Sequence, residues 1–138
     1  MNKKDIRWKQ RFENFKMAFQ RLCEAIETIQ KYPDNLLLQA GVIQTYEFTF
    51  ELAWKTLKDY LENEGFDVPS PKKTMRQAFQ AGYLKNIDLW LQALADRNKT
   101  SHAYDEEMSR EVVQNIREKY FHIIQELYLF FEKELNHD

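Results

Sequence analysis

Residues 8–29 read WKQRFENFKMAFQRLCEAIETI. The large apolar side chains of this stretch recur in steps of three or four: Trp8, Phe12, Phe15, Phe19, Leu22, Ile26 and Ile29. Because an α-helix completes a turn every ~3.6 residues, this spacing places them on one face of a helix. Tyr32-Pro33 follows, where we expect the helix to end. The stretch therefore predicts a long helix with one buried face.

The rest of the chain predicts four more helices, each with its own start and stop signals. They run from Asp34 or Asn35 to Gly65, from Ser70-Pro71 to about Ala81 with Gly82 as the stop, from Asn86 to about Asn98, and from Asp105 almost to the C-terminus. The buried stripe expected for the last helix is Val112, Ile116, Tyr120, Ile123, Leu127 and Phe130. Long amphipathic helices joined by short connections favour an antiparallel arrangement. We therefore predict an all-α chain: an antiparallel, up-down four-helix bundle with one extra short helix, forming a single domain over residues 1–138.

Composition excludes several classes of protein. Three Gly and three Pro among 138 residues leave little material for the turns of a β-sandwich or barrel. A net charge of −2 argues against a general nucleic-acid binder, which needs an excess of cations. Cys23 is the only cysteine, which excludes an internal disulfide and a CxxC motif. No apolar run is long enough to span a membrane, and the N-terminus lacks a signal-peptide core, so we expect a cytoplasmic location.

The sequence holds more aromatic residues than one core seam can take. They are Tyr46, Phe48, Phe50, Trp54, Phe79, Tyr83 and Trp90. We expect some of them to face a second copy of the chain in a homodimer. The alternative is that single aromatic side chains lie exposed without a partner, as they often do on helices.

Polar and charged side chains that could bind or react with a substrate converge in residues 96–104, DRNKTSHAY. Arg97 offers a planar, permanently charged group suited to phosphate or carboxylate. His102 is the side chain here whose ordinary pKa allows proton transfer near neutral pH. Tyr104 adds a phenol that can donate a hydrogen bond or act as a nucleophile. Glu47 falls on the stripe of the second helix and is a candidate to hold Arg97.

Taken alone, the spacing R-x4-H is a weak signal. The alternative is a helix C-terminus at which Arg97 contacts the last carbonyls and His102 lies in a polar turn. Glu47 can equally lie at the edge of its seam in water, and Glu51 is expected to pair with Lys55 at i, i+4. No phosphate-binding glycine loop and no group of metal ligands is present, so we predict no metal or cofactor bound to this chain.

Three segments together resemble the nucleotidyltransferase substrate-binding protein family, part of the wider HEPN group of helical domains. They are QTYEFTFELAWKTLK at residues 44–58, SPKKTMRQAFQAGYL at 70–84 and RNKTSHAY at 97–104. The resemblance implies a HEPN-like bundle that dimerises and works beside a separately encoded minimal nucleotidyltransferase. That partner would bind ATP and Mg²⁺ and supply the catalytic carboxylates. Arg97, Asn98 and His102 match the Arg-polar-x3-His site of HEPN proteins, and Tyr104 matches the tyrosine that accepts AMP in HEPN toxins.

Three functions remain open at this point. The first is a substrate-binding, non-catalytic subunit whose pocket is lined by Arg97, Asn98, His102, Tyr104 and Glu47. The second is a metal-independent ribonuclease toxin of a toxin-antitoxin pair, with Arg97 and His102 catalytic, RNA as its substrate, and silencing by AMP transfer to Tyr104. The third is a plain helical scaffold. Asp105-Glu106-Glu107, just beyond the motif, would repel an RNA backbone and so weighs against the second function, unless basic side chains fold around the RNA. The candidates for that are Lys72, Lys73, Arg76 and Lys99.

Overall fold

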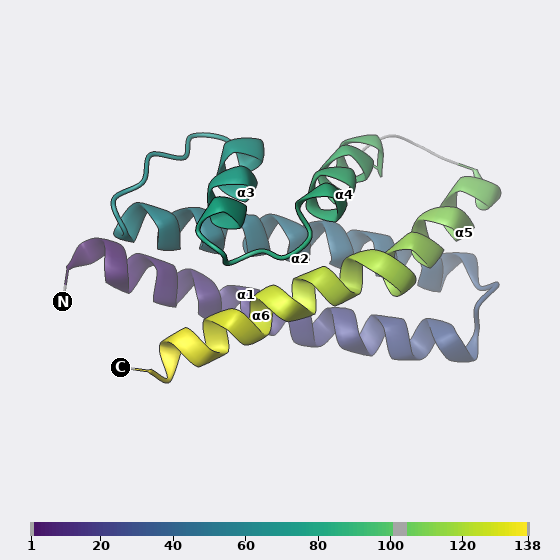
Figure 1. The fold of residues 1–138 in the computed structure, drawn as a ribbon. Coiled ribbons are helices and arrows are strands. Elements are labelled where there is room, and N and C mark those ends of the chain that lie inside the picture. Colours follow the sequence, from purple (N-terminus) through teal and green to yellow (C-terminus); the bar gives the residue numbers. More distant parts are fainter. Residues whose placement is uncertain (1, 101–104, 138) are drawn as a thin grey trace.

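The computed structural model describes residues 2–100 and 105–137, apart from the side chains of residues 98–100 (Figure 1). Within that part every regular element is helical, which confirms the all-α class. The elements are α1 (Lys3–Lys31), α2 (Leu36–Asn63), α3 (Pro71–Gln80), α4 (Ile87–Thr100), α5 (Glu106–Asn115), the π-helical turn η1 (Ile116–Tyr120) and α6 (Phe121–Leu135).

Side-chain caps fix where the helices begin. Asn35 accepts a hydrogen bond from the Leu38 amide at 3.0 Å, so Asn35 caps α2 in preference to Asp34. Ser70 does the same for α3 with Lys73 at 3.2 Å, and Pro71 occupies the first helical position. These contacts satisfy amide groups that have no partner within the helix. Similar caps at Asn86 and Asp105 open α4 and α5, and the sequence predicted the first of them.

Two glycines allow the chain to leave a helix in a left-handed conformation. Gly65 follows α2 with φ of 98°, and Gly82 follows α3 with φ of 86°. A side chain is strained in this region because its Cβ approaches the following carbonyl. Both stops were predicted from the sequence.

The glycines give a pair of stability predictions with opposite signs. Gly82→Ala should lower the free energy of unfolding by about 1–2 kcal/mol, because alanine tolerates a positive φ poorly. Gly41 lies inside α2, and a Cβ there would meet no atom within 4 Å, so Gly41→Ala should raise stability by about 0.5–1 kcal/mol. Urea unfolding of both variants tests this. Equal effects of the two substitutions would contradict it.

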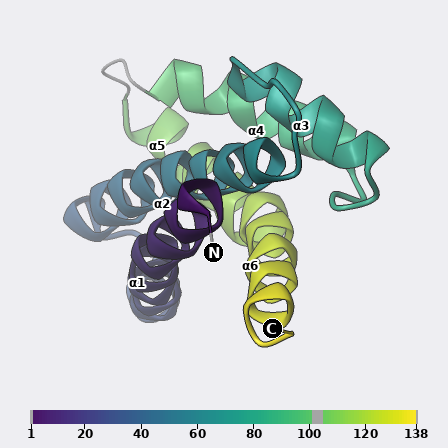
Figure 2. The same cartoon turned by 90° about the vertical axis from the view of Figure 1, so that its left-hand side faces the viewer.

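Helix α2 lies in the middle of the molecule. Figure 2 shows α1 and α6 on one side of α2 and α3 with α4 on the other. α1 and α2 run antiparallel, and the α5–η1–α6 run follows the length of the pair (Figure 1). α3 and α4 instead cross α2 steeply (Figures 1 and 2), so the strict up-down order of four helices is not confirmed.

The core between α1 and α6 is aromatic. Phe12 is fully buried and packs against Phe15, Tyr128 and Phe131, with ring centroids 6.0, 5.6 and 5.6 Å away. Every member of the predicted stripe from Trp8 to Ile29 is buried except Ile26, which is half-buried. Residues 8–29 therefore build the core face that their spacing predicted.

The last helical run contains a π-helical turn that the sequence did not predict. The Phe121 amide donates to the Ile116 carbonyl, five residues earlier, where an α-helix would bond four residues earlier. After this turn Phe131 is fully buried, while Phe130, which the stripe predicted to be buried, is only half-buried. Prediction from the spacing of apolar residues assumes a constant period of 3.6 residues per turn, so it does not reveal a π-helical turn.

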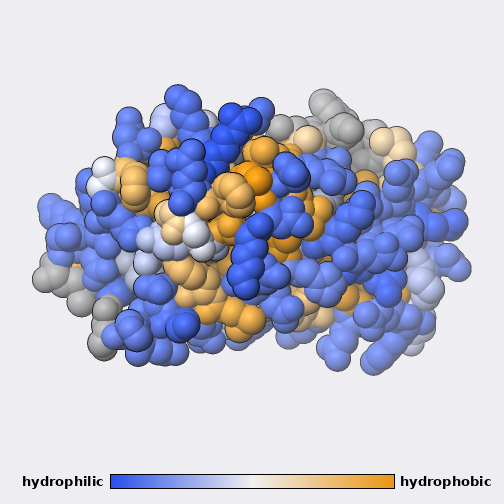
Figure 3. All heavy atoms as spheres, in the orientation of Figure 1, coloured by the Kyte–Doolittle hydropathy of each residue, from blue (hydrophilic) through white to orange (hydrophobic). Residues whose placement is uncertain are grey.

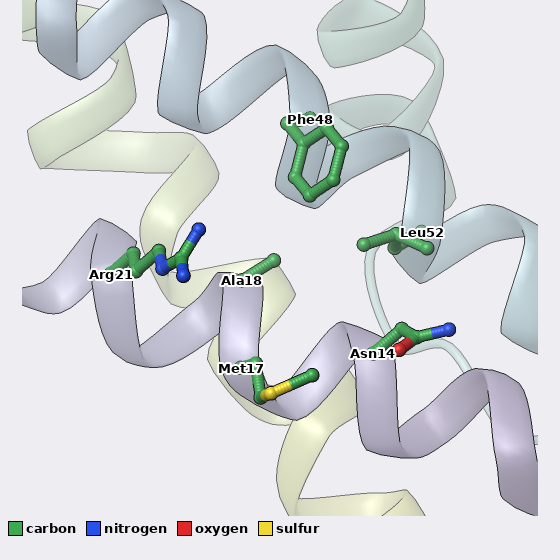
Figure 4. Close-up of a pocket in the computed structure, with 6 residues that line it drawn as sticks. All are labelled: Asn14, Met17, Ala18, Arg21, Phe48 and Leu52. Carbon is green, nitrogen blue, oxygen red and sulfur yellow. The ribbon is translucent and has the colours of Figure 1, made fainter.

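Some large apolar side chains remain on the surface. Figure 3 shows hydrophobic atoms gathered in the middle of one face and surrounded by hydrophilic ones. On the α1–α2 side, Met17 and Phe48 are 54% and 61% exposed and line a cavity of about 220 Å³ with Asn14, Ala18, Arg21 and Leu52 (Figure 4). Among the expected surface aromatics Phe48 and Phe79 are exposed, whereas Tyr46, Phe50 and Trp90 are buried. None of the helices described is both long and apolar enough to cross a membrane.

Candidate functional site

The candidate site begins at the end of α4. Trp90 and Ala93 are buried against the core, which fixes the orientation of this helix. Asp96 and Arg97 follow in its last turns and are half-buried. The helix thus carries both side chains toward α2 and η1, where each finds a partner.

Arg97 is held from α2 by Glu51. Its Nη2 donates to Oε2 of Glu51 in an ion pair between side chains that are 33% and 29% exposed. The same carboxylate pairs with Lys55 Nζ at 3.3 Å and accepts from Trp54 Nε1 at 3.2 Å. A carboxylate that receives three donors is fixed in place, and so it fixes the guanidinium while leaving part of it open to solvent.

Asp96 is held from the other side by Tyr120 of η1. The Tyr120 hydroxyl donates to Oδ2 of Asp96, and its ring stacks on Tyr46 of α2 at 5.8 Å. Tyr46 is 1% exposed, and its hydroxyl has no hydrogen-bond partner among the described residues. The stacked rings of Tyr46 from α2 and Tyr120 from η1 thus lie next to the end of α4.

Burial and nearby carboxylates raise the pKa values of Tyr46 and Tyr120, and also that of Tyr83 in the connection between α3 and α4. Burial is the main cause for Tyr46, Tyr120 and Tyr83, and Asp96 or Glu64 adds to it for the last two. The pKa of Tyr83 rises to about 12. All three are therefore neutral in the folded chain at pH values where free tyrosine begins to ionise, near pH 10.

A raised pKa makes stability depend on pH in a defined direction. The folded state holds the phenol protons more tightly, so their contribution is complete below about pH 10 and is lost as the pH rises through the raised values. We expect the Tm to fall steadily between pH 10 and 12. Phenolate absorbance at 295 nm and thermal melting over this range test it. Ionisation of all tyrosines near pH 10 with an unchanged Tm would contradict it.

The structure brings together only part of the predicted site. Arg97 lies at the end of α4, as expected, and it pairs with the carboxylate of Glu51, one turn after the proposed Glu47. Glu47 is half-buried. The predicted pair of Glu51 with Lys55 is confirmed. His102, Tyr104 and the side chain of Asn98 lie outside the described residues, so their convergence on Arg97 stays a prediction.

Sequence reasoning missed Glu51, Asp96 and Tyr120 as members of this site. Glu51 and Arg97 are 46 positions apart, and Asp96 and Tyr120 are 24 apart. No local period links residues at these separations. Tyr120 was expected only as part of the core stripe, and its burial at 1% exposure agrees with that. In the part of the chain described here, no group of three or more His, Cys, Asp or Glu residues could hold a metal ion.

The chain is similar to known proteins in sequence and in fold. It resembles "Probable ribonuclease HepT" of Haemophilus influenzae, with 32% identity over 84 residues. That match covers 57% of this chain and spans only 58% of the relative's length. A crystal structure of a Thermus thermophilus protein is similar in fold, with a TM-score of 0.64 and 29% identity over 77% of this chain and 94% of that chain.

A family match covers most of the sequence. Residues 10–133 match the family described as "Nucleotidyltransferase substrate binding protein like". This range runs from the first turns of α1, just after Trp8, to the last turn of α6 and includes all of α4. It confirms the resemblance drawn from the three sequence segments. The chain belongs to the nucleotidyltransferase substrate-binding-protein-like family.

Proposed function

We propose that this chain is the substrate-binding, non-catalytic subunit of a two-component nucleotidyltransferase system in the cytoplasm. A separately encoded minimal nucleotidyltransferase would be its partner and would bind ATP and Mg²⁺. The family match over residues 10–133 is the observation that carries the proposal. The ion pair of Arg97 with Glu51 supports it, because a fixed and partly open guanidinium suits a phosphate-bearing substrate.

The proposed pocket is lined by Arg97, Asn98, His102, Tyr104 and Glu47. Arg97 would bind the anionic group of the substrate, and Glu51 would hold the guanidinium at the angle that binding needs. His102 and Tyr104 would contribute hydrogen bonds from the segment that follows α4. The phosphate-bearing acceptor would then lie between this surface and the nucleotide on the partner.

We also propose a HEPN-like arrangement and a homodimer. α1, α2, α4 and the α5–η1–α6 run would be the four bundle helices, with α3 as the extra short one. Met17 and Phe48 of the α1–α2 face support self-association, because two large apolar side chains lie more than half exposed beside each other. Light scattering coupled to size exclusion should give twice the chain mass, and Phe48→Glu should reduce it to the monomer mass.

The transfer reaction tests the main proposal. ATP labelled at the α-phosphate is incubated with this chain, with its cognate nucleotidyltransferase, and with both, using a desalted cell extract as the source of acceptor. Label should enter an acceptor only when both chains are present. Transfer at the same rate by the nucleotidyltransferase alone would overturn the proposal.

A second candidate function is a metal-independent ribonuclease that AMP transfer silences. The similarity to "Probable ribonuclease HepT" favours it. His102 would take the proton of the RNA 2′-hydroxyl as its oxygen attacks the adjacent phosphorus, and would return a proton to the departing 5′-oxygen. Arg97 would stabilise the charge on the phosphoryl oxygens. In the silencing step the Tyr104 oxygen would attack the α-phosphorus of ATP, with pyrophosphate leaving.

Expression and mass measurements separate the two functions. If the chain is a ribonuclease, its expression alone should arrest growth, and Arg97→Ala or His102→Ala should restore growth. Incubation with the partner and ATP should add the mass of one AMP group, and Tyr104→Phe should abolish that addition while leaving the arrest intact. Equal growth with and without these substitutions would remove the ribonuclease.

A further inference from the structure

We propose a second ligand site, for a small phosphate-bearing molecule of nucleotide size, centred on Arg117 of the π-helical turn. The site lies between the C-terminal half of α1 and the α5–η1–α6 run, and it shares no lining residue with the Arg97 site. Two cavities of about 190 and 330 Å³ meet there, and Gln114, Arg117 and Glu118 line both.

The first observation that points to a bound anion is the burial of Arg117 Nε without a hydrogen-bond acceptor. Its side chain is half-buried, and its Nε is shielded from solvent with no hydrogen-bond acceptor. Among the described residues the guanidinium forms no ion pair either. Arginine remains charged at any physiological pH, and an N–H donor shielded from water without an acceptor is costly. A bound anion would remove that cost.

The neighbouring carboxylates do not supply the missing partner. Glu118 accepts a hydrogen bond from Gln114 Nε2 at 3.3 Å, and Asp34 in the smaller cavity pairs with Arg110 at 3.7 Å. Both acids line the cavities, so the site is not simply a cationic patch. An anion would therefore be held through directed hydrogen bonds from Arg117, and the acids would favour a ligand that also carries hydroxyl groups.

The larger cavity has the mixed lining that a nucleotide requires. Phe121 and Ile26 give it an apolar wall, while Gln30 and His122 offer polar groups. Its volume of about 330 Å³ falls within the usual range for small-ligand sites. In this arrangement Arg117 takes the phosphate, Phe121 contacts the base, and Glu118 accepts from a sugar hydroxyl.

The π-helical turn explains why Arg117 is available here. The turn places both Ile116 and Tyr120 in the core, at 0% and 1% exposure, and leaves Arg117 to project between the helices. π-helical turns are rare and occur often at functional sites, because they cost regular hydrogen bonding. The inference does not depend on the proposed nucleotidyltransferase partnership.

The test uses the full chain labelled with ¹⁵N at arginine. The Arg117 Nε–Hε resonance is assigned by its absence in Arg117→Lys. Titration with AMP should shift this resonance to saturation, inorganic phosphate should shift it more weakly, and adenosine should leave it unmoved. By calorimetry Arg117→Lys should weaken AMP binding about tenfold or more, because a forked, charge-assisted contact is lost.

Arg7→Lys is the matched control, because Arg7 is exposed on α1 and lines neither cavity. This variant should bind AMP as the unaltered chain does. An Arg117 resonance that AMP does not move would overturn the proposal. So would equal AMP affinity in Arg117→Lys, provided its melting curve shows a folded chain. If that variant does not fold, triple-resonance spectra of the unaltered chain assign the Arg117 resonance, and its titration with AMP decides the question.

Discussion

Phe12→Ala is expected to lower the free energy of unfolding by about 3–5 kcal/mol, the usual cost of removing a buried phenyl ring. Phe12 is fully buried, and its ring meets those of Phe15, Tyr128 and Phe131. The substitution would leave a cavity between α1 and α6 that rigid neighbouring rings cannot fill. Because domains of this size are stable by only about 5–15 kcal/mol, the variant should be close to unfolding at physiological temperature.

Phe79→Ala is the matched control. It removes the same ring from a helix, but Phe79 is 44% exposed, so the loss should stay within about 1 kcal/mol. Chemical unfolding followed by circular dichroism measures both values. Similar losses for the two variants would show that α1 and α6 do not enclose the aromatic core described here.

Arg97→Ala should reduce nucleotidyl transfer in the two-chain reaction by about 100-fold or more, the usual effect of deleting a fixed charged donor at a reacting phosphate. The substitution leaves Glu51 with Lys55 and Trp54 as partners, so the fold should survive. Arg97→Lys keeps the charge but lacks the forked geometry, and should retain an intermediate rate.

The controls for this prediction separate chemistry from assembly. Arg7→Ala removes an exposed arginine from α1, away from the proposed site and dimer face, and should leave transfer unchanged. Arg97→Ala should still form the complex with the nucleotidyltransferase, which pull-down measures in parallel. Full transfer by Arg97→Ala in an intact complex would show that Arg97 does not contact the substrate.

Local signals in the sequence predicted the helices well. Asn35, Ser70 and Asn86 cap helices by side-chain contacts with amide groups three residues ahead, and Gly65 and Gly82 end them with positive φ. Each of these is a short-range effect that a few residues determine. The spacing of the aromatic residues predicted the buried face of α1 for the same reason.

Features that depend on distant residues could not be predicted in this way. The pairing of Glu51 with Arg97 depends on how α4 crosses α2, and that crossing depends on the packing of Trp90 and Ala93. Amphipathic spacing predicts that a helix has a buried face but not the angle at which it packs. The π-helical turn at 116–120 likewise breaks the period on which the prediction of the last helix relied.

Co-elution with the cognate nucleotidyltransferase is the most direct test of the central claim, that this chain is the partner subunit of such an enzyme. The two purified proteins are mixed at micromolar concentrations and separated by size exclusion with light scattering. The account predicts one stable peak that contains both chains. The mass of this peak should equal the summed masses of a whole number of copies of each chain. Two separate peaks at the masses of the individual proteins would contradict it.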